Sequence, residues 1–397
     1  MTTACERLKS ARKLRSLTQR ELAEAAGVSL STLRRLEQDE QAGARMETWR
    51  RLAIALRLPT MDLVGEPAEA DDEAVEPWEG VKRALNTPAA LLETPEEPPT
   101  MEGVGGALDA LAKLVAKDRY QDIATVLPAL LRDAEALGSE GRELHVRALQ
   151  RVGWLLIHTR QFKAAGDALT RSLDGVTDRV QQAVTVDYLC WLLLRQGQLS
   201  KARELATEWA DRTEPVRVTR ATSVELAMWG TMLLRLSGAA IRDNRPGEAA
   251  DALRYARSAA EALGREFRFP PQISNSSFGP VTVLLKTAEN AAINGQPQAV
   301  LRVGSKVAKL QNSKSPRFRS PVTSSDLNRH LLDVSSALQQ TGEHAKSVRK
   351  LMDINSSAPE WLPNQPYARD ILGRVVEERR TLTQDMRDLA VSVRLPI

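Results

Sequence analysis

The chain has 397 residues, of which 42% are hydrophobic, 27% charged and 4% aromatic, and its formal net charge is +4. This length accommodates two or three domains of an ordinary globular protein. No apolar run approaches the roughly 18 residues that cross a membrane, and the first twenty residues lack the apolar core of a signal peptide. The two cysteines, Cys5 and Cys190, fit a reducing compartment. We therefore expect a cytoplasmic protein without a membrane segment.

The charge is unevenly distributed along the chain. Residues 1–65 contain twelve Lys and Arg against eight Asp and Glu, whereas residues 66–100 contain ten acidic residues and two basic ones. A basic N-terminal region suits a polyanion, and a polyanion would repel the acidic stretch that follows. The basic excess is small, so the argument for DNA depends on motifs.

Two short helices are predicted between residues 17 and 37. Thr18 and Glu21 have the spacing of a capping box, in which the hydroxyl accepts the Glu21 amide proton and the carboxylate reaches back. Gly27 ends the first helix, because glycine adopts the left-handed conformation at little cost, and Ser29 caps the second. Two helices joined by so short a turn predict a helix-turn-helix, with an ordinary helical hairpin as the less favoured alternative.

Residues 5–64 resemble the DNA-binding domain of the XRE family, the phage-repressor type of helix-turn-helix. The resemblance implies a five-helix, lambda-repressor-like fold with an ion pair between Arg12 and Glu37. It also implies that Gln19 lies beside a DNA phosphate and that side chains of the second helix face base edges. The residues that we assign to DNA binding are Thr18, Gln19, Ser29, Leu30, Ser31, Thr32, Arg34, Arg35 and Arg45.

The remainder of the N-terminal region fits the same small domain. Helices are expected at 5–16 and 46–56, with a last turn after Pro59. The loop 38–45 departs from the family, because it is acidic where relatives often carry Gly and Lys. Arg45 is the one residue of this loop from which we expect a phosphate contact.

A linker is predicted from 66 to 103. Six prolines accompany the acidic residues of this stretch, a composition that does not form a packed core. The segment 78–86 interrupts it, with Trp78 followed by apolar residues at helical spacing. We expect a short helix there, docked on a neighbouring domain. The chain thus divides into domains at 1–65 and 104–397, joined by the linker.

From 104 to the end, helical segments alternate with short turns. The expected segments are 105–117, 120–137, 141–159, 162–174, 179–196, 199–212, 219–242, 246–264, 279–294, 297–311, 324–341, 344–356, 366–380 and 383–392. Several turns combine a small residue with an alanine that follows a few residues later, as at 197–202 and 295–299, and Val152-Gly153 matches another element of the same pattern. These features resemble the tetratricopeptide repeat, which implies an α-solenoid with a concave face. The spacing is irregular, so a superhelix of helical hairpins is predicted without a repeat count.

No sequence motif indicates catalysis. The chain contains no Walker loop, GxGxxG, HExxH, GxSxG or CxxC, and its four histidines lack ligand spacing. Carboxylate pairs such as Glu377-Glu378 lie among arginines, where a solvated face is the simpler interpretation. We expect no enzyme activity, no cofactor and no metal.

The segment 268–280 breaks the helical pattern, and loops of this length are commonly functional or disordered. Phe278-Gly279-Pro280 resembles a feature of actinobacterial regulators that join an XRE head to a tetratricopeptide body. Peptide-sensing regulators of the RRNPP type share this architecture and bind a peptide backbone through asparagines on the concave face. By that resemblance we assign ligand binding to Asn275, Phe278, Asn290 and Asn294, while a packed crossover between repeats is the alternative.

The sequence as a whole predicts an all-α transcriptional regulator. It would bind double-stranded DNA as a homodimer and sense a peptide or small-molecule effector through its helical-repeat body. The first alternative is a protein-interaction scaffold whose head lacks specific DNA binding, for which the acidic loop is the best support. A third interpretation, an enzyme regulator acting through its repeat surface, would not require Gln19 and Arg35.

Overall fold

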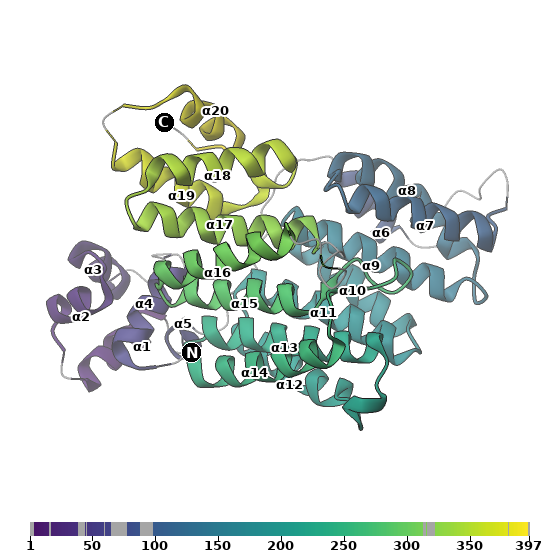
Figure 1. Ribbon diagram of the computed structural model, residues 1–397, viewed down its shortest axis with the longest axis horizontal. Helices are drawn as coiled ribbons and strands as arrows, with labels where there is room; N and C mark the ends of the chain where they lie inside the picture. The colour runs from purple at the N-terminus through teal and green to yellow at the C-terminus, as the bar shows by residue number, and fades with distance from the viewer. Residues whose placement is uncertain are drawn as a thin grey trace.

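A computed structural model describes residues 4–15, 17–38, 44, 46–58, 60–64, 78–87, 98–312, 315, 322–379 and 381–395. It confirms the predicted fold class: a small helical head is followed by a body of stacked helices (Figure 1). The predicted phosphate contact Arg45, and the parts of the predicted linker at 66–77 and 88–97, lie outside the described residues.

The head consists of α1 (Ala4–Leu14), α2 (Gln19–Ala26), α3 (Leu30–Gln38), α4 (Met46–Leu56) and α5 (Thr60–Val64). The capping box between Thr18 and Glu21 is formed, and Gly27 ends α2 at φ 62°. Its core is a single apolar cluster in which Leu22, Leu33 and Leu52 are completely buried. The helix positions therefore follow from local signals, and the apolar faces that those signals orient make one core.

A short helix, α6 (Glu79–Asn86), lies where the apolar island of the linker predicts one. Trp78, Val81 and Leu85 are buried in the core of the body, and α6 packs against the helices that occupy 120–136 and 162–175. The apolar side of α6 thus explains its position on the body.

The body is built from helix pairs, each packed on the next. Its helices are α7 (Met101–Val115), α8 (Tyr120–Ala136), α9 (Arg142–His158), α10 (Phe162–Gly175), α11 (Arg179–Gln196), α12 (Leu199–Thr213), α13 (Ser223–Arg242), α14 (Pro246–Leu263), α15 (Pro280–Ile293), α16 (Pro297–Gln311), α17 (Ser324–Gln340), α18 (His344–Ser357), α19 (Pro366–Glu377) and α20 (Gln384–Ser392). Two 3₁₀ turns, Val218–Arg220 and Leu362–Asn364, lie in connections. All fourteen expected segments are helical, with small differences at their ends.

Three local features differ from the prediction. Helix α13 begins at Ser223 and not at 219, because Thr222 caps it in a capping box with Glu225. Helix α7 begins at Met101 and not at 105, because the Thr100 hydroxyl accepts the Gly103 amide proton at 3.0 Å and caps the helix ahead of its glycines. The interrupted segment contains a small antiparallel ribbon, β1 (Phe267–Arg268) with β2 (Ser277–Phe278), in which Phe267 pairs with Phe278. This ribbon is the only β structure among the described residues.

Helix α13 has the length and apolar composition of a membrane span. However, 83% of its apolar stretch is buried inside the protein. Burial of this extent is typical of a core helix, and α13 indeed packs against α12, α14 and α11.

The two ends of the body meet across its concave side. The Ser324 hydroxyl, at the start of α17, donates to Asp118 in the turn between α7 and α8 at 2.7 Å. The backbone amide of Gln121, at the start of α8, donates to Glu360 at 2.9 Å, and Arg119 pairs with the same carboxylate. The superhelix is thereby closed around an internal space.

The head is joined to the body through α4 and α5. Arg50 is 5% exposed, and its guanidinium donates to the carbonyl oxygens of Ile241 and Ile293 and to the side-chain oxygen of Asn294. Thr60 donates through its hydroxyl to Arg242 O at 3.0 Å. These acceptors lie at the C-terminal ends of α13 and α15, where the helix dipole favours a cation. Helices α2 and α3 lie on the side of the head that points away from the body (Figure 1).

Candidate nucleic-acid interface and candidate effector cavity

The N-terminus of α3 carries a group of hydroxyls. The Ser29 Oγ accepts the Thr32 amide proton at 3.0 Å, and it lies 2.9 Å from the Ser31 Oγ and 2.7 Å from the Thr32 Oγ1. Ser29 and Ser31 are exposed, while Leu30 and Thr32 are half-buried. Hydroxyls at a helix N-terminus are suited to contacts with phosphate or base edges.

The outer side of α3 presents two arginines. Arg34 and Arg35 are exposed, and neither has an ion-pair partner among the described residues. The opposite side of the helix is anchored in the head by Leu33 and Leu36, which are buried. An amphipathic helix of this kind holds its guanidinium groups outward, where they are free to contact an anionic partner.

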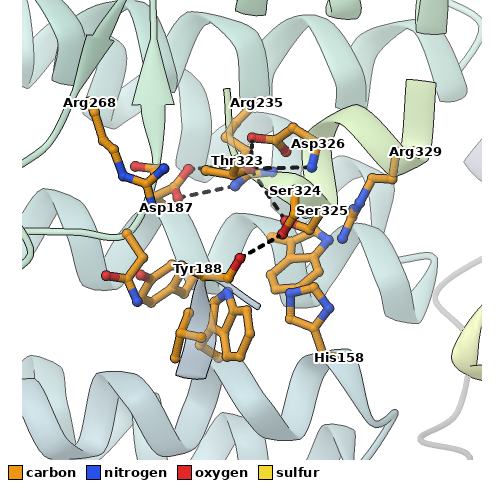
Figure 2. Close-up of a pocket in the computed structure, with 16 residues that line it drawn as sticks. His158, Asp187, Tyr188, Arg235, Arg268, Thr323, Ser324, Ser325, Asp326 and Arg329 are labelled. Carbon is orange, nitrogen blue, oxygen red and sulfur yellow. Dashed lines mark hydrogen bonds and ion pairs between the residues drawn. The ribbon is translucent and has the colours of Figure 1, made fainter. Parts of the chain in front are cut away.

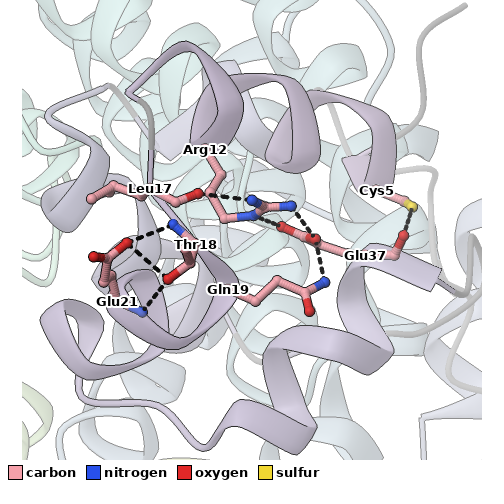
Figure 3. A network of polar contacts seen from close by, with 7 residues as sticks. All are labelled: Cys5, Arg12, Leu17, Thr18, Gln19, Glu21 and Glu37. Atoms are coloured by element: carbon pink, nitrogen blue, oxygen red, sulfur yellow. Dashed lines mark hydrogen bonds and ion pairs between the residues drawn. The ribbon is translucent and has the colours of Figure 1, made fainter.

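A polar network fixes α3 against α1 and α2 (Figure 3). The Arg12 Nε and Nη2 donate to the two oxygens of Glu37 at 2.6 and 2.9 Å, and the Gln19 Nε2 donates to the same carboxylate at 2.7 Å. Arg12 also donates to Leu17 O at 2.8 Å. The ion pair implied by the family resemblance is therefore present, and together with Gln19 it forms a network with one residue from each of three helices.

The network sets the protonation of Glu37. Burial acts to raise the pKa of this carboxyl, but the hydrogen bonds from Arg12 and Gln19 outweigh burial, and the pKa lies below its ordinary value of 4.5. The hydrogen bond to Glu37 raises the pKa of Arg12 in turn. Both groups are charged at neutral pH, so the pair is a bidentate, charge-assisted contact.

Two of the residues assigned to DNA binding, Thr18 and Gln19, make hydrogen bonds within the head. The Thr18 hydroxyl and amide both donate to Glu21, at 2.8 Å each. Gln19 is half-buried and uses one amide hydrogen for Glu37, which leaves the second hydrogen. Both residues lie at the N-terminus of α2, where Gln19 belongs to the network that holds α3 and Thr18 lies beside it (Figure 3).

The four residues predicted to bind a ligand are not brought together. Phe278 is fully buried, with its ring against Gly230 of α13. The Asn290 Nδ2 donates to the Ser237 Oγ at 2.9 Å inside the body, and the Asn294 side chain accepts from Arg50 of the head. These three side chains have structural contacts within the body or between the body and the head. Asn275 alone lines a cavity.

The interrupted segment is a packed crossover that reaches across the body. The Arg151 Nη2 of α9 donates to Pro271 O at 2.8 Å, and the Gln181 Nε2 of α11 donates to Gln272 O at 3.2 Å. Phe269 is 1% exposed. The alternative weighed from the sequence, a crossover between repeats, thus describes most of the segment, and its tip at Asn275 forms part of a cavity wall.

A polar cavity of about 70 Å³ lies between α9, α11, α13 and the start of α17 (Figure 2). His158, Tyr188, Arg268, Asp326 and Arg329 are among the residues that line it. Figure 2 shows the Asp187 carboxylate against Arg235, an ion pair with distances of 2.5 and 3.1 Å. Burial lowers the pKa of His158 well below its ordinary value, and the nearby Arg329 and Arg195 add to this effect. His158 is therefore neutral, and its Nδ1 lies 2.9 Å from the Tyr120 hydroxyl.

A larger cavity of about 500 Å³ adjoins the first and shares Trp191, Arg235, Asp326 and Arg329 with it. Most of its lining comes from the first helices of successive pairs, α11, α13, α15, α17 and α19, so it occupies the concave side of the body. Glu47 and Arg51 of α4 complete the wall from the head. Its volume falls in the range of about 300–1,000 Å³ that is typical of small-ligand sites.

Sequence reasoning missed the residues that characterise this cavity. Arg195 lies near the end of α11 and Arg329 lies on α17, and no sequence motif marks either residue. The sequences of α9 and α11 contain a signal for such a cavity. Both helices are buried on nearly all sides, yet they carry the polar residues Arg151, Gln181 and Asp187. Polar residues in such a helix indicate an internal polar space. No group of His, Cys, Asp and Glu suited to a metal ion occurs among the described residues.

Comparison with known proteins identifies the head. A family model described as helix-turn-helix matches residues 8–63. The apo form of the competence regulator ComR from Streptococcus vestibularis is similar to this chain at 13% sequence identity and a TM-score of 0.29, covering 84% of this chain and 98% of that one. No curated protein matches the sequence. The head is a helix-turn-helix domain, the kind of domain with which transcription regulators bind DNA.

Proposed function

We propose that this protein is a sequence-specific DNA-binding transcription regulator whose helical body senses an effector. The observation that supports this proposal most strongly is the outer side of α3, where Arg34 and Arg35 are exposed without ion-pair partners among the described residues. In a helix-turn-helix domain the second helix lies in the major groove, where an arginine can bind a guanine edge through two hydrogen bonds.

The roles within the head follow from position. Ser29, Leu30, Ser31 and Arg35 would face base edges, while Thr18, Gln19 and Arg45 would contact phosphates. Thr32 and Arg34 flank the base-reading side and complete the surface. Phosphate contacts fix the register of the domain, and base contacts supply specificity. We propose the same division of the chain as before, with a DNA-binding domain at 1–65, a linker at 66–103 and a tetratricopeptide-like body at 104–397.

The effector site that we propose is the concave cavity of the body. The cavity is lined by α13 and α15, and the C-terminal ends of these same helices accept hydrogen bonds from Arg50 of the head. Glu47 and Arg51 of α4 line it directly. A ligand that prefers one arrangement of these helices would shift the position of the head by its differential affinity.

Selection of bound duplexes from a random pool tests the DNA-binding proposal. The intact protein should enrich a defined sequence at fixed salt, and the Arg35→Ala variant should enrich that sequence less strongly. Enrichment of no sequence, with weak binding of every duplex, would contradict the proposal. That result would instead favour the scaffold function, which the acidic residues of the loop 38–45 support.

A further inference from the structure

One arginine lies where three cavities of the body meet. Arg329 of α17 lines the two cavities described above and also a third, of about 50 Å³, between α15 and α17. Its guanidinium carbon lies 4.8 Å from the centre of the Trp191 ring. The aromatic face stabilises the cation, and the Arg329 side chain forms part of the wall of all three cavities.

Arg329 lacks a counter-charge within salt-bridge distance. No ion pair or hydrogen bond of its side chain occurs among the described residues, and its Nε is buried without a partner. Arg195 of α11 and Arg268 of β1 also line the cavities without an ion pair among these residues. Unpaired guanidinium groups in a cavity are costly unless something else satisfies them.

Three acidic residues that line the cavities interact with partners other than Arg195 and Arg329. Asp187 pairs with Arg235, and Glu289 pairs with both Lys286 and Arg242. Asp326 accepts the Thr323 hydroxyl at 2.6 Å at the start of α17. These groups therefore leave Arg195 and Arg329 without close partners.

The larger cavity has an excess of positive charge. It is lined by eight Lys and Arg against five Asp and Glu. Burial, with the charge of Glu289, raises the pKa of Asp333 to about 8, which weakens its negative charge near neutral pH. Repulsion is visible in Arg195, where burial and the charges of Arg329, Arg160 and Arg242 lower the pKa to about 9. The stretch 313–321, which precedes α17, contains no Asp or Glu that could supply a counter-charge.

Neutral donors accompany these cations. Trp191 is 6% exposed, and its indole N–H is buried without an acceptor among the described residues. The side-chain amide nitrogen of Asn275, on the wall of the smaller cavity, is likewise buried without an acceptor. Buried donors are normally hydrogen-bonded. Two donors without acceptors, next to unpaired guanidinium groups, therefore suit a ligand that accepts hydrogen bonds.

We infer that the concave cavity binds the carboxylate or phosphate group of an anionic effector, held by Arg195 and Arg329 beside Trp191. This inference deepens the proposed function, since it rests on the body as the effector site and adds the chemical class of the effector. Planar guanidinium groups match both kinds of oxyanion. The volume of the larger cavity leaves room for the remainder of a small organic molecule or the end of a peptide.

Titration of the intact protein with simple anions tests the inference. The probes are inorganic phosphate and succinate, with glycerol as the neutral control and sodium chloride used to hold ionic strength constant. Tryptophan fluorescence reports binding, because Trp154 and Trp191 line the smaller cavity. At least one of the two anions should give a saturable change and raise the melting temperature, while glycerol should not. The stronger of the two responses identifies the phosphate or the carboxylate class.

Charge-removing variants connect this response to the site. Arg195→Gln and Arg329→Gln should each raise the dissociation constant of the responding anion about tenfold or more, the effect of losing one charge-assisted hydrogen bond. Arg329→Lys should retain part of the binding. Arg254→Gln is the matched control, because Arg254 is exposed on α14, where it pairs with Asp251, and its titration should be unchanged.

The melting temperature of each variant, measured without anion, shows whether Arg195 and Arg329 bind the effector or stabilise the fold. Removing one of several mutually repelling cations should leave that temperature unchanged or higher. A marked fall in Arg195→Gln and Arg329→Gln would overturn the inference, and so would titrations that are identical in all variants or that follow ionic strength alone. None of these measurements contains DNA. A protein that binds the anion through these arginines but enriches no duplex would therefore contradict the proposed function and leave the anion site standing.

Discussion

Arg35 is the residue on which sequence specificity should depend most. It is exposed on α3, one helical turn beyond Ser31, while the buried side of α3 is held by Leu33 and Leu36. Its removal should therefore leave the fold intact. A guanidinium that binds a guanine edge through two hydrogen bonds contributes about 1–3 kcal/mol of discrimination.

We predict that Arg35→Ala lowers the preference for the target sequence by about 5–150-fold, which corresponds to about 1–3 kcal/mol, and leaves the melting temperature unchanged. The measurement is the ratio of dissociation constants for target and scrambled duplexes at fixed salt. Arg254→Ala, on the exposed side of the body, is the control and should keep the wild-type ratio. An unchanged ratio in Arg35→Ala would refute its role in base recognition.

Glu37 makes a second residue-scale prediction, which concerns stability. The carboxyl is 4% exposed and bound by Arg12 and Gln19, so Glu37→Ala leaves the half-buried guanidinium of Arg12 without this partner. Removing one member of such a partly buried pair costs about 1–3 kcal/mol. Hydrogen exchange at the backbone amides of α2, measured in the intact chain at pH 7, should accelerate accordingly. If only DNA affinity changes, the pair is not structural.

The same pair predicts a pH dependence. The folded pKa of Glu37 lies below its ordinary value of 4.5, so its contribution is fully present above about pH 4.5 and is lost as the pH falls through the folded pKa. The stability difference between the wild type and Glu37→Ala should shrink as the pH falls through this window. A difference that stays constant down to pH 3 would show that the carboxylate charge contributes nothing.

At the scale of elements, the crossover segment 268–280 packs tightly against α13. A Cβ atom added at Gly230 would overlap the ring of Phe278, which is fully buried and has no space to move into. Overpacking of this kind costs about 1–3 kcal/mol. Gly230→Ala should lower the melting temperature of the body.

Gly166→Ala is the matched control for that variant. The added Cβ would lie 3.7 Å from Leu192, an ordinary contact. Alanine is the better helix former by roughly 0.5–1 kcal/mol, so this variant should be slightly more stable than the wild type. Equal effects of the two substitutions would contradict the close approach of Gly230 and Phe278.

The joint between head and body makes another prediction at this scale. Arg50 and Arg51 are neighbours on α4, but Arg50 is buried against α13 and α15 while Arg51 is 43% exposed and pairs with Glu47. Arg50→Met removes the donors to three acceptors, and a buried acceptor left unpaired costs about 1–3 kcal/mol. The head should then detach more often.

Small-angle X-ray scattering measures this detachment as a larger radius of gyration in Arg50→Met than in the wild type. Arg51→Met is the matched control and should scatter like the wild type. If both variants keep the wild-type radius, the contacts of Arg50 do not hold the head on the body.

These examples indicate which features a sequence can predict. Thr18, Glu21 and Gly27 act within a few residues of themselves, so the helices of the head and their connection could be derived from local chemistry. The helix pairs of the body could be derived as well, because their apolar spacing is local. The Arg12–Glu37 pair came from family resemblance, since nothing local links α1 to the end of α3.

Contacts between distant helices could not be predicted in this way. Arg50 and Arg51 are adjacent residues of the same type, and only the positions of α13 and α15 make one buried and the other exposed. Asn290 and Asn294 fit the pattern of ligand contacts, but they face Ser237 and Arg50. The cavity around Arg195 and Arg329 likewise exists because helices from remote parts of the chain converge, which no local pattern encodes.

At the scale of the whole molecule, we predict a homodimer. One head reads few base pairs, whereas two heads related by a two-fold axis can bind half-sites about one helical turn apart. Light scattering at micromolar concentration should give twice the mass of one chain, free or on target DNA. A monomer under both conditions would contradict the prediction.

The central claim, that the protein reads DNA sequence, is tested most directly by one ratio. It is the dissociation constant of the intact protein for a scrambled duplex divided by that for its selected target, at the same near-physiological salt concentration. Specific regulators give ratios on the order of 10³ or more, and we predict such a value here, on a target with two-fold symmetry. A ratio near one would contradict the account.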